Sequence, residues 1–334
     1  MILTIKGAAS ACALLACAVL LHGCGGAGDA QQHDDAAQTQ GDFAPVTVAH
    51  TLGTTAVNSL PQRVAALDMN EVDFLDQLGV PIAGMPKDFI PAFLAKYRED
   101  ETITDLGSIV QPNMEKVYAL RPDLLLISSL HANQYDALSH IAPTIPFDVD
   151  YQDTGSDYFE TIKAHLLTLG RIFGREELAR RKADQLDAKI AEARDAIAGR
   201  PEKALILMHN AGAYRFMGVN SRYGFVHEAL GVSPASEEDA ESLHGLPVSS
   251  EFIQQADPDI IYLIDRTAVM EHRAGMSVAT MDNPLIRATK AWKNKRVIFV
   301  DPEAWYVTGA GPTSLGIVID DVLRGYGDGG VATD

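Results

Sequence analysis

The side chains that most often carry out enzyme chemistry form no recognisable catalytic arrangement in this sequence. All three cysteines, Cys12, Cys17 and Cys24, lie within the first 24 residues, so the rest of the chain has neither a disulfide nor a thiolate metal site. A Gly-x-Ser-x-Gly turn, a Gly-x-Gly-x-x-Gly loop opening a helix, and paired carboxylates beside a histidine are absent from fitting contexts. The sequence therefore favours a role other than catalysis.

Charge and length narrow the class of protein further. The chain has 27 basic and 45 acidic residues, a formal net charge of −18, which argues against a protein that binds nucleic-acid phosphates. The net charge does not exclude small ligands of either sign, because a local cluster of cations can oppose the overall charge. With 334 residues and 47% apolar content, the chain is long enough for two domains, each with its own core.

The N-terminus has the pattern of an exported lipoprotein. A weakly cationic start at residues 1–6 is followed by an uncharged run over 7–21, which ends in Leu21-His22-Gly23-Cys24. These four residues resemble a bacterial lipobox, in which the peptide is cut before a cysteine that takes a lipid. We therefore predict a signal peptide over 1–23, a flexible tether over 24–43, and a periplasmic protein anchored to a membrane through Cys24. An ordinary signal peptide cut near Cys24 is the alternative.

The rest of the sequence alternates between strand and helix patterns in two halves. Predicted strands at 63–67 and 124–128 and helices at 70–78 and 114–120 form an N-terminal α/β lobe over 44–156. Predicted strands at 204–208, 260–264 and 297–300 and helices at 223–230, 250–256 and 313–323 form a C-terminal α/β lobe over 200–330. This alternation predicts mostly parallel sheets.

Two pairs of residues suggest that both lobes follow one plan. Glu115 lies eight residues before Asp123, in a helix that leads through a Pro-Asp turn into an apolar strand. Glu251 and Asp259 repeat the same arrangement 136 residues later. Chance is the alternative for so short a match.

The linker over 157–199 is predicted to contain the helix that joins the lobes. The pattern is helical to residue 169, breaks near Gly170 and Gly174, and is helical again from 176. Apolar residues form only a narrow stripe among charged residues, as expected for a strut lying across two lobes. A helix between the lobes allows less hinge motion than strands or loops would.

Eight short segments follow one another along the chain: Gly84-Met85-Pro86-Lys87, Ile141-Ala142-Pro143-Thr144, Leu169-Gly170-Arg171-Ile172-Phe173-Gly174, Ser221-Arg222-Tyr223-Gly224-Phe225-Val226-His227, Leu243-His244-Gly245, Ser250-Glu251-Phe252, Asp265-Arg266 and Asp301-Pro302-Glu303-Ala304-Trp305-Tyr306. In order and spacing they resemble the class III, helical-backbone periplasmic binding proteins that serve ABC importers. Within that class the resemblance is to ferric-siderophore-binding lipoproteins of the catecholate, or enterochelin-binding, type.

The resemblance implies how the cargo is held. Ferric iron would be bound as a siderophore complex, with no intrinsic cofactor in the protein. Two catechols fill four of the six positions around octahedral iron, and in this family a histidine and a tyrosine fill the others. The matching residues are His244 and Tyr306, and coordination would displace the phenol proton of Tyr306. Taken alone, a loop histidine and a loop tyrosine are usually surface residues with a hydrogen bond.

A ferric catecholate carries excess negative charge, so the resemblance also implies cations in the cleft. Arg222 and Arg266 match two arginines of the family, and a guanidinium suits several catecholate oxygens at once. Salt bridges to nearby acids are the alternative. A third arginine of the family is replaced by Leu130, which either weakens anion binding or transfers the contact to His131 or Lys87.

Further residues match the family in roles outside the anion site. Glu115 and Glu251 match the glutamates that dock the two lobes onto an inner-membrane permease, which works with its ATPase; helix N-terminal glutamates favoured by the helix dipole are the alternative. Trp305 either packs beside the ligand or anchors its loop.

We expect a monomer with no nucleic-acid partner. A haem-binding or hydroxamate-siderophore-binding protein of the same class is the alternative function.

Overall fold

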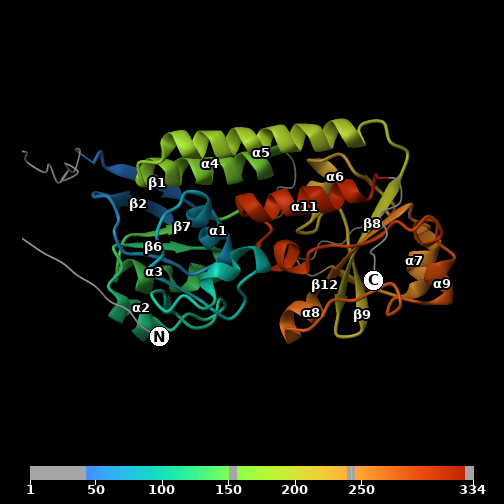
Figure 1. The fold of residues 1–334 in the computed structure, drawn as a ribbon, viewed down its shortest axis with the longest axis horizontal. Helices are drawn as coiled ribbons and strands as arrows, with labels where there is room; N and C mark the ends of the chain where they lie inside the picture. Colours follow the sequence, from blue (N-terminus) through green and yellow to red (C-terminus); the bar gives the residue numbers. More distant parts are fainter. Residues whose placement is uncertain (1–42, 150–155, 239–241, 243–244, 328–334) are drawn as a thin grey trace, which may run out of the picture. The chain divides into compact units, whose positions relative to one another are not determined.

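The computed structural model describes residues 43–149, 156–238, 242 and 245–327 (Figure 1). The predicted signal peptide, Cys24, almost all of the tether and His244 lie outside these residues. The two lobes belong to one compact unit that begins at Phe43. Among the described residues, no helix has both the length and the apolar character needed to cross a membrane.

The first lobe is built on a sheet of five parallel strands in the order β5-β4-β3-β6-β7. Leu124 and Leu126 of β6 face the core that contains α1, whereas Leu125 and Ile127 face the core that contains α2 and α3. Both sheet faces are covered, which is why β6 is apolar throughout. The strands are β3 (Val64–Ala66), β4 (Gly84–Met85), β5 (Thr104–Asp105), β6 (Leu124–Ile127) and β7 (Thr144–Pro146), and the helices are α1 (Met69–Gln77), α2 (Met114–Leu120) and α3 (Tyr135–Ser139).

The second lobe has a mixed sheet in the order β11-β9-β8-β12-β13, with β10 paired to β8. β8, β10, β12 and β13 are parallel, whereas β9 and β11 form an antiparallel edge. The strands are β8 (Lys203–Asn210), β9 (Ala213–Met217), β10 (Ser233–Pro234), β11 (Leu246–Val248), β12 (Ile260–Asp265) and β13 (Val297–Phe299). The helices are α6 (Gly224–Glu228), α7 (Ser250–Ala256), α8 (Arg266–Glu271), α9 (Pro284–Arg287), α10 (Lys290–Lys293) and α11 (Pro312–Arg324).

The predicted two-lobed α/β fold with mostly parallel sheets is confirmed. The antiparallel hairpin of β1 (Val46–His50) and β2 (Gly53–Val57) was not predicted, and neither was β9. These three strands are short and lack a clear alternation of apolar and polar residues, so only their pairing with neighbouring strands defines them.

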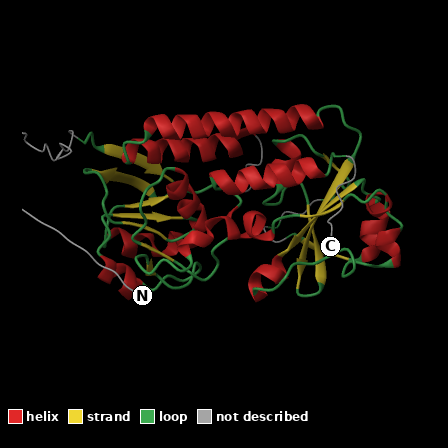
Figure 2. Cartoon of the chain, viewed as in Figure 1, coloured by secondary structure: helices red, strands yellow, loops and turns green. Residues whose placement is uncertain are grey.

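Two helices, α4 (Ser156–Ile172) and α5 (Glu176–Ile197), connect the lobes, and Figure 2 shows α5 running past both sheets. The predicted break is present, although α4 continues through Gly170. A side chain at Gly170 would place its Cβ 2.5 Å from that of Ala179, so the glycine allows α4 and α5 to pack closely. Gly174 has φ +61°, which makes the tight turn between the helices possible.

The internal repeat is present in the structure. The helices that carry Glu115 and Glu251 both end in a left-handed residue, Arg121 in α2 and Asp257 in α7. The N–H groups of Asp123 and Asp259 then donate to the first residues of the neighbouring strand segments, at 3.0 Å to the carbonyl of Arg63 and 2.8 Å to that of Lys203. Equivalent turns therefore lead into β6 and β12.

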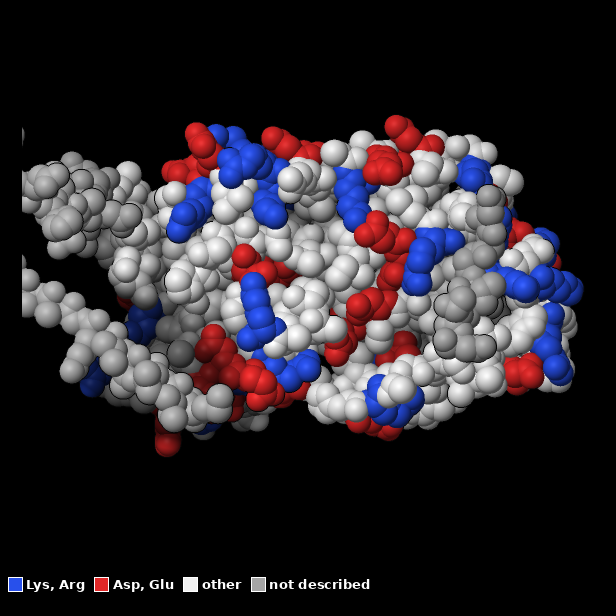
Figure 3. Space-filling model, viewed as in Figure 1, with Lys and Arg blue, Asp and Glu red and all other residues white. Residues whose placement is uncertain are grey.

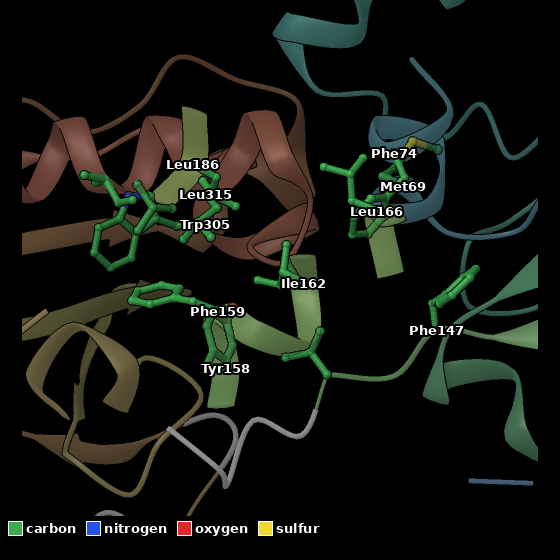
Figure 4. Packing of buried hydrophobic residues seen from close by; sticks show 14 of the residues in the cluster. Met69, Phe74, Phe147, Tyr158, Phe159, Ile162, Leu166, Leu186, Trp305 and Leu315 are labelled. Carbon is green, nitrogen blue, oxygen red and sulfur yellow. The ribbon is translucent and has the colours of Figure 1, made fainter. Parts of the chain in front are cut away.

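The lobes share one apolar core. It includes Met69 and Phe74 of α1, Leu166 of α4 and Leu315 of α11 (Figure 4). Because this core is continuous across the junction, hinge motion would have to disturb close packing, so the structure favours lobes that keep their arrangement.

Polar contacts from α1 reinforce this junction. Asp73 Oδ2 accepts the backbone N–H groups of Thr313 and Ser314, at 2.9 and 3.0 Å, in the first turn of α11. Asn70 Oδ1 accepts the N–H of Ala310 at 3.0 Å. A Cβ at Gly311 would lie only 2.2 Å from Asp73 Oδ2, so this close approach requires glycine. A side chain of the first lobe thus caps a helix of the second.

We expect this carboxyl to make stability depend on pH. Burial raises the pKa of Asp73 to about 6, against hydrogen bonds from α11 that lower it. An unfolded aspartate ionises near pH 4. The neutral Asp73 carboxyl therefore stabilises the folded state fully below pH 4, and this stabilisation is lost as the pH rises through 6. Between pH 4 and 7, the free energy of unfolding of the wild type should therefore fall by about 2 kcal/mol relative to that of Asp73→Asn. Urea denaturation of both proteins at each pH measures this difference. A constant difference across that range would contradict this assignment.

Candidate functional site

Polar groups of the second lobe gather around the phenol ring of Tyr306. Arg266 follows β12 directly, and its Nε donates to the Tyr306 hydroxyl at 2.6 Å. Its Nη1 donates to Asn210 Oδ1 at 2.7 Å, at the end of β8. Since β8 and β12 are parallel neighbours, their carboxyl ends bring these side chains together. Asn210 was not predicted as a site residue, although its place at the end of the strand beside β12 is a usable signal.

A second guanidinium lies on the same tyrosine. The Arg222 guanidinium carbon is 5.4 Å from the centroid of the Tyr306 ring, and that of Arg266 is 5.0 Å away. Arg222 Nη2 also donates to the backbone carbonyl of Tyr306 at 3.2 Å. The structure therefore brings together three of the predicted site residues, two cations and a phenol, all partly buried.

The loop that carries Tyr306 is held from behind by Trp305. The Trp305 side chain is fully buried, and its indole N–H donates to Asp321 Oδ2 at 2.9 Å. Its backbone carbonyl accepts the hydroxyl of Tyr223 at 3.2 Å. Of the two predicted roles for Trp305, this placement favours anchoring the loop. The residues 304–308 form a single π-helical turn, a conformation often found at functional sites.

The first lobe presents an apolar residue where the second presents an arginine. Leu130 lies 136 residues before Arg266, the spacing of the internal repeat, and is 54% exposed. Val110, a second apolar residue of the first lobe, is also exposed, at 63%. His131 is fully buried instead, and its Nε2 donates to the Ile109 carbonyl at 2.9 Å. Burial lowers the pKa of His131, so the structure favours a neutral, structural histidine over a cation that replaces the missing arginine.

Lys87 lies in a cavity of about 500 Å³ between the lobes. The first lobe lines the cavity with residues 87–90 and Arg98. The second lobe lines it with Ala268, Val269, His272, Arg273, Gly275, Asp301, Pro302, Glu303 and Val307, the residue after Tyr306. Lys87 Nζ donates to the Asp100 carbonyl at 2.7 Å. Contact between Lys87 and a ligand stays a prediction, and its position on the cavity wall supports it.

A family model described as periplasmic binding protein matches residues 64–304. The chain belongs to the periplasmic binding protein family. The ferric-anguibactin-binding protein FatB of Vibrio anguillarum is 58% identical over 282 residues, covering 84% of this chain and 88% of FatB. The predicted resemblance is therefore confirmed, and membership in this family makes the chain a binding protein and not an enzyme.

Two solved structures of siderophore-binding proteins share the fold. BauB, bound to a complex of two acinetobactin molecules with ferric iron, has a TM-score of 0.82 at 57% identity, covering 85% of this chain and 99% of BauB. The catecholate-siderophore-binding protein VctP of Vibrio cholerae has a TM-score of 0.78 at 31% identity, covering 84% of this chain and 100% of VctP. In the BauB structure the iron belongs to the bound siderophore complex.

The glutamates predicted to dock onto a permease occupy equivalent exposed positions in this periplasmic binding protein. Glu115 lies in the first turn of α2, whose cap is Asn113, and Glu251 lies in the first turn of α7, whose cap is Ser249. A hydrogen bond from the Ser249 hydroxyl lowers the pKa of Glu251. On the face drawn in Figure 3, acidic and basic side chains of the described residues are interspersed. Docking through Glu115 and Glu251 stays a prediction.

Proposed function

We propose that the chain captures a ferric catecholate siderophore between its lobes and delivers it to an ABC importer. The observation that carries this proposal is that Arg222 and Arg266 both contact Tyr306, one at its backbone carbonyl and the other at its hydroxyl. Together they form a dense cationic group in a protein of net charge −18. Such a group is suited to a ligand with several anionic oxygens. The names of FatB and BauB, which bind ferric siderophore complexes, and of VctP, which binds catecholate siderophores, support the same class of ligand.

Tyr306 is proposed to contribute its oxygen to the iron. Ferric iron is a hard cation that prefers anionic oxygen, and loss of the phenol proton would supply one. The Arg266 Nε that now donates to this hydroxyl would then form a charge-assisted hydrogen bond to a phenolate. His244, which precedes β11 but lies outside the described residues, is the proposed second protein ligand.

Replacing the coordinating oxygen should discriminate between siderophores of different denticity. Tyr306→Phe keeps the ring but removes the oxygen, so it should weaken a tetradentate bis-catecholate ferric complex by roughly 2–5 kcal/mol. A hexadentate tris-catecholate already fills all six positions on iron and should lose far less. Fluorescence titration of the detergent-solubilised full chain measures both affinities, and only the tetradentate complex should shift its charge-transfer band.

Tyr118→Phe is the matched control, since Tyr118 is 71% exposed on α2 and lies outside the proposed site. It should change neither affinity. If Tyr306→Phe weakens the binding of both complexes equally, without a spectral change, Tyr306 only lines the cleft and is not an iron ligand.

The two exposed glutamates are proposed to dock the lobes onto the two halves of the permease. Glu115→Gln combined with Glu251→Gln should abolish siderophore-dependent iron uptake by cells while leaving siderophore affinity unchanged. The pair Glu176→Gln and Glu192→Gln on the exposed face of α5 removes the same charge elsewhere and should leave uptake intact. A large loss of siderophore affinity in the first variant would place these glutamates in the binding site.

Membrane attachment is proposed to occur through a lipid on Cys24. Cys24→Ser should leave the protein unprocessed or release it from the membrane fraction, whereas Cys17→Ser, within the predicted signal peptide, should be processed normally. Fractionation of cells followed by immunoblotting measures both effects. Unchanged size and unchanged membrane attachment of Cys24→Ser would exclude this anchor.

A further inference from the structure

The cavity between the lobes differs in charge from the arginine site beside it. Its charged lining residues are three cations and three acids, so their formal charges cancel. Each of them already has a partner in the protein; Glu303 Oε2, for example, accepts the N–H of Ala92 at 2.7 Å across the lobes. A cavity with this balance gives an anionic group no net attraction. The charged lining residues are Lys87, Arg98, Arg273, Asp88, Asp301 and Glu303.

Two aromatic rings meet at this cavity, one from each lobe. Phe89 and His272 stack with their ring centroids 5.3 Å apart and their planes 20° from parallel. His272 ends α8 with φ 49° and ψ 44°, a left-handed conformation that costs a residue with a side chain some strain. Both residues line the cavity, and His272 is exposed, so the pair is accessible to a ligand.

The remaining lining connects this aromatic pair with the proposed iron site. Val307 follows Tyr306 directly, Ala268 lies two residues after Arg266, and both line the cavity. The surface offered to a ligand is therefore cationic at Arg222 and Arg266, whereas the cavity presents an aromatic pair and no net formal charge.

We propose that the cavity binds a neutral aromatic ring carried by the siderophore, stacked against Phe89 and His272, while Arg222 and Arg266 bind the anionic oxygens around iron. This inference rests on the proposed function and narrows it to siderophores with an uncharged ring-bearing arm. Phe89 and His272 act as specificity-determining residues, because stacking favours a ring over an alkyl or charged group of similar size.

Three probes that differ only in the arm test this assignment. They are the 2:1 ferric complexes of N-benzyl-, N-ethyl- and N-carboxymethyl-2,3-dihydroxybenzamide, titrated into the detergent-solubilised full chain. The wild type should bind the benzyl complex about tenfold more tightly than the ethyl complex. The carboxymethyl complex should bind no more tightly than the ethyl complex, because the cavity has no net positive charge.

Variants at the aromatic pair separate ring stacking from simple burial. Phe89→Leu keeps an apolar side chain and His272→Ala removes the imidazole; each should bring the benzyl and ethyl affinities to within about twofold, with the ethyl affinity nearly unchanged. His140→Ala, at an exposed histidine of the first lobe outside this cavity, should keep the wild-type ratio. Since His272 is exposed, its variant remains informative even where Phe89→Leu affects folding.

The outcomes distinguish this inference from the function on which it rests. A benzyl preference that persists in both variants, equal wild-type affinities for the benzyl and ethyl complexes, or tightest binding of the carboxymethyl complex would each overturn the aromatic subsite alone. If no ferric probe binds the wild type, or if Arg222→Ala combined with Arg266→Ala weakens none of them, the proposed function fails as well.

Discussion

A buried carboxyl of the first lobe caps the first turn of a helix in the second lobe, and the two-lobed arrangement depends on this contact. Asp73 meets the start of α11 where Gly311 leaves room for it, and Asn70 adds a hydrogen bond to the preceding turn. The continuous core around these groups means that the junction cannot open without exposing apolar surface. The site between the lobes is therefore supported by a frame that favours a fixed geometry.

This frame explains how loops can hold functional groups accurately. Arg266 follows a fully buried strand, and the loop that carries Tyr306 is fixed by the buried Trp305 and its hydrogen bond to Asp321. Trp305 is buried behind the site, yet it fixes the segment that carries Tyr306. The groups that meet the ligand are thus positioned by residues that do not touch it, so little conformational entropy remains to be lost on binding.

The two lobes share a plan but present different chemistry at equivalent positions. The turns after α2 and α7 correspond closely, and the exposed glutamates keep their places in both lobes. Beyond the following strands the correspondence ends, because the first lobe exposes Leu130 and the second places Arg266 beside Tyr306. Repetition therefore preserves the positions of the two glutamates proposed to dock onto a two-part membrane partner, whereas divergence leaves an exposed leucine in one lobe where the other has an arginine.

The sequence by itself determined the elements that have a strong local signal. Apolar runs between turn residues predicted β6 and β12, Gly174 marked the turn between α4 and α5, and the spacing of 136 residues revealed the repeat. Arg222, Arg266 and Tyr306 were identified through ordered motifs, and the structure places them in contact. These features are local, because periodicity and turn chemistry depend on neighbours in the chain.

Only the tertiary structure decided which distant residues meet. Nothing near Asp73 in the sequence indicates that it caps α11, some 240 residues later, and nothing near Phe89 indicates that it stacks on His272. Burial of His131 and Trp305 likewise follows from the packing of elements that are far apart in the chain. The physical reason is that a hydrophobic or polar side chain specifies the kind of environment that stabilises it, whereas the fold of the whole chain selects the residues that provide that environment.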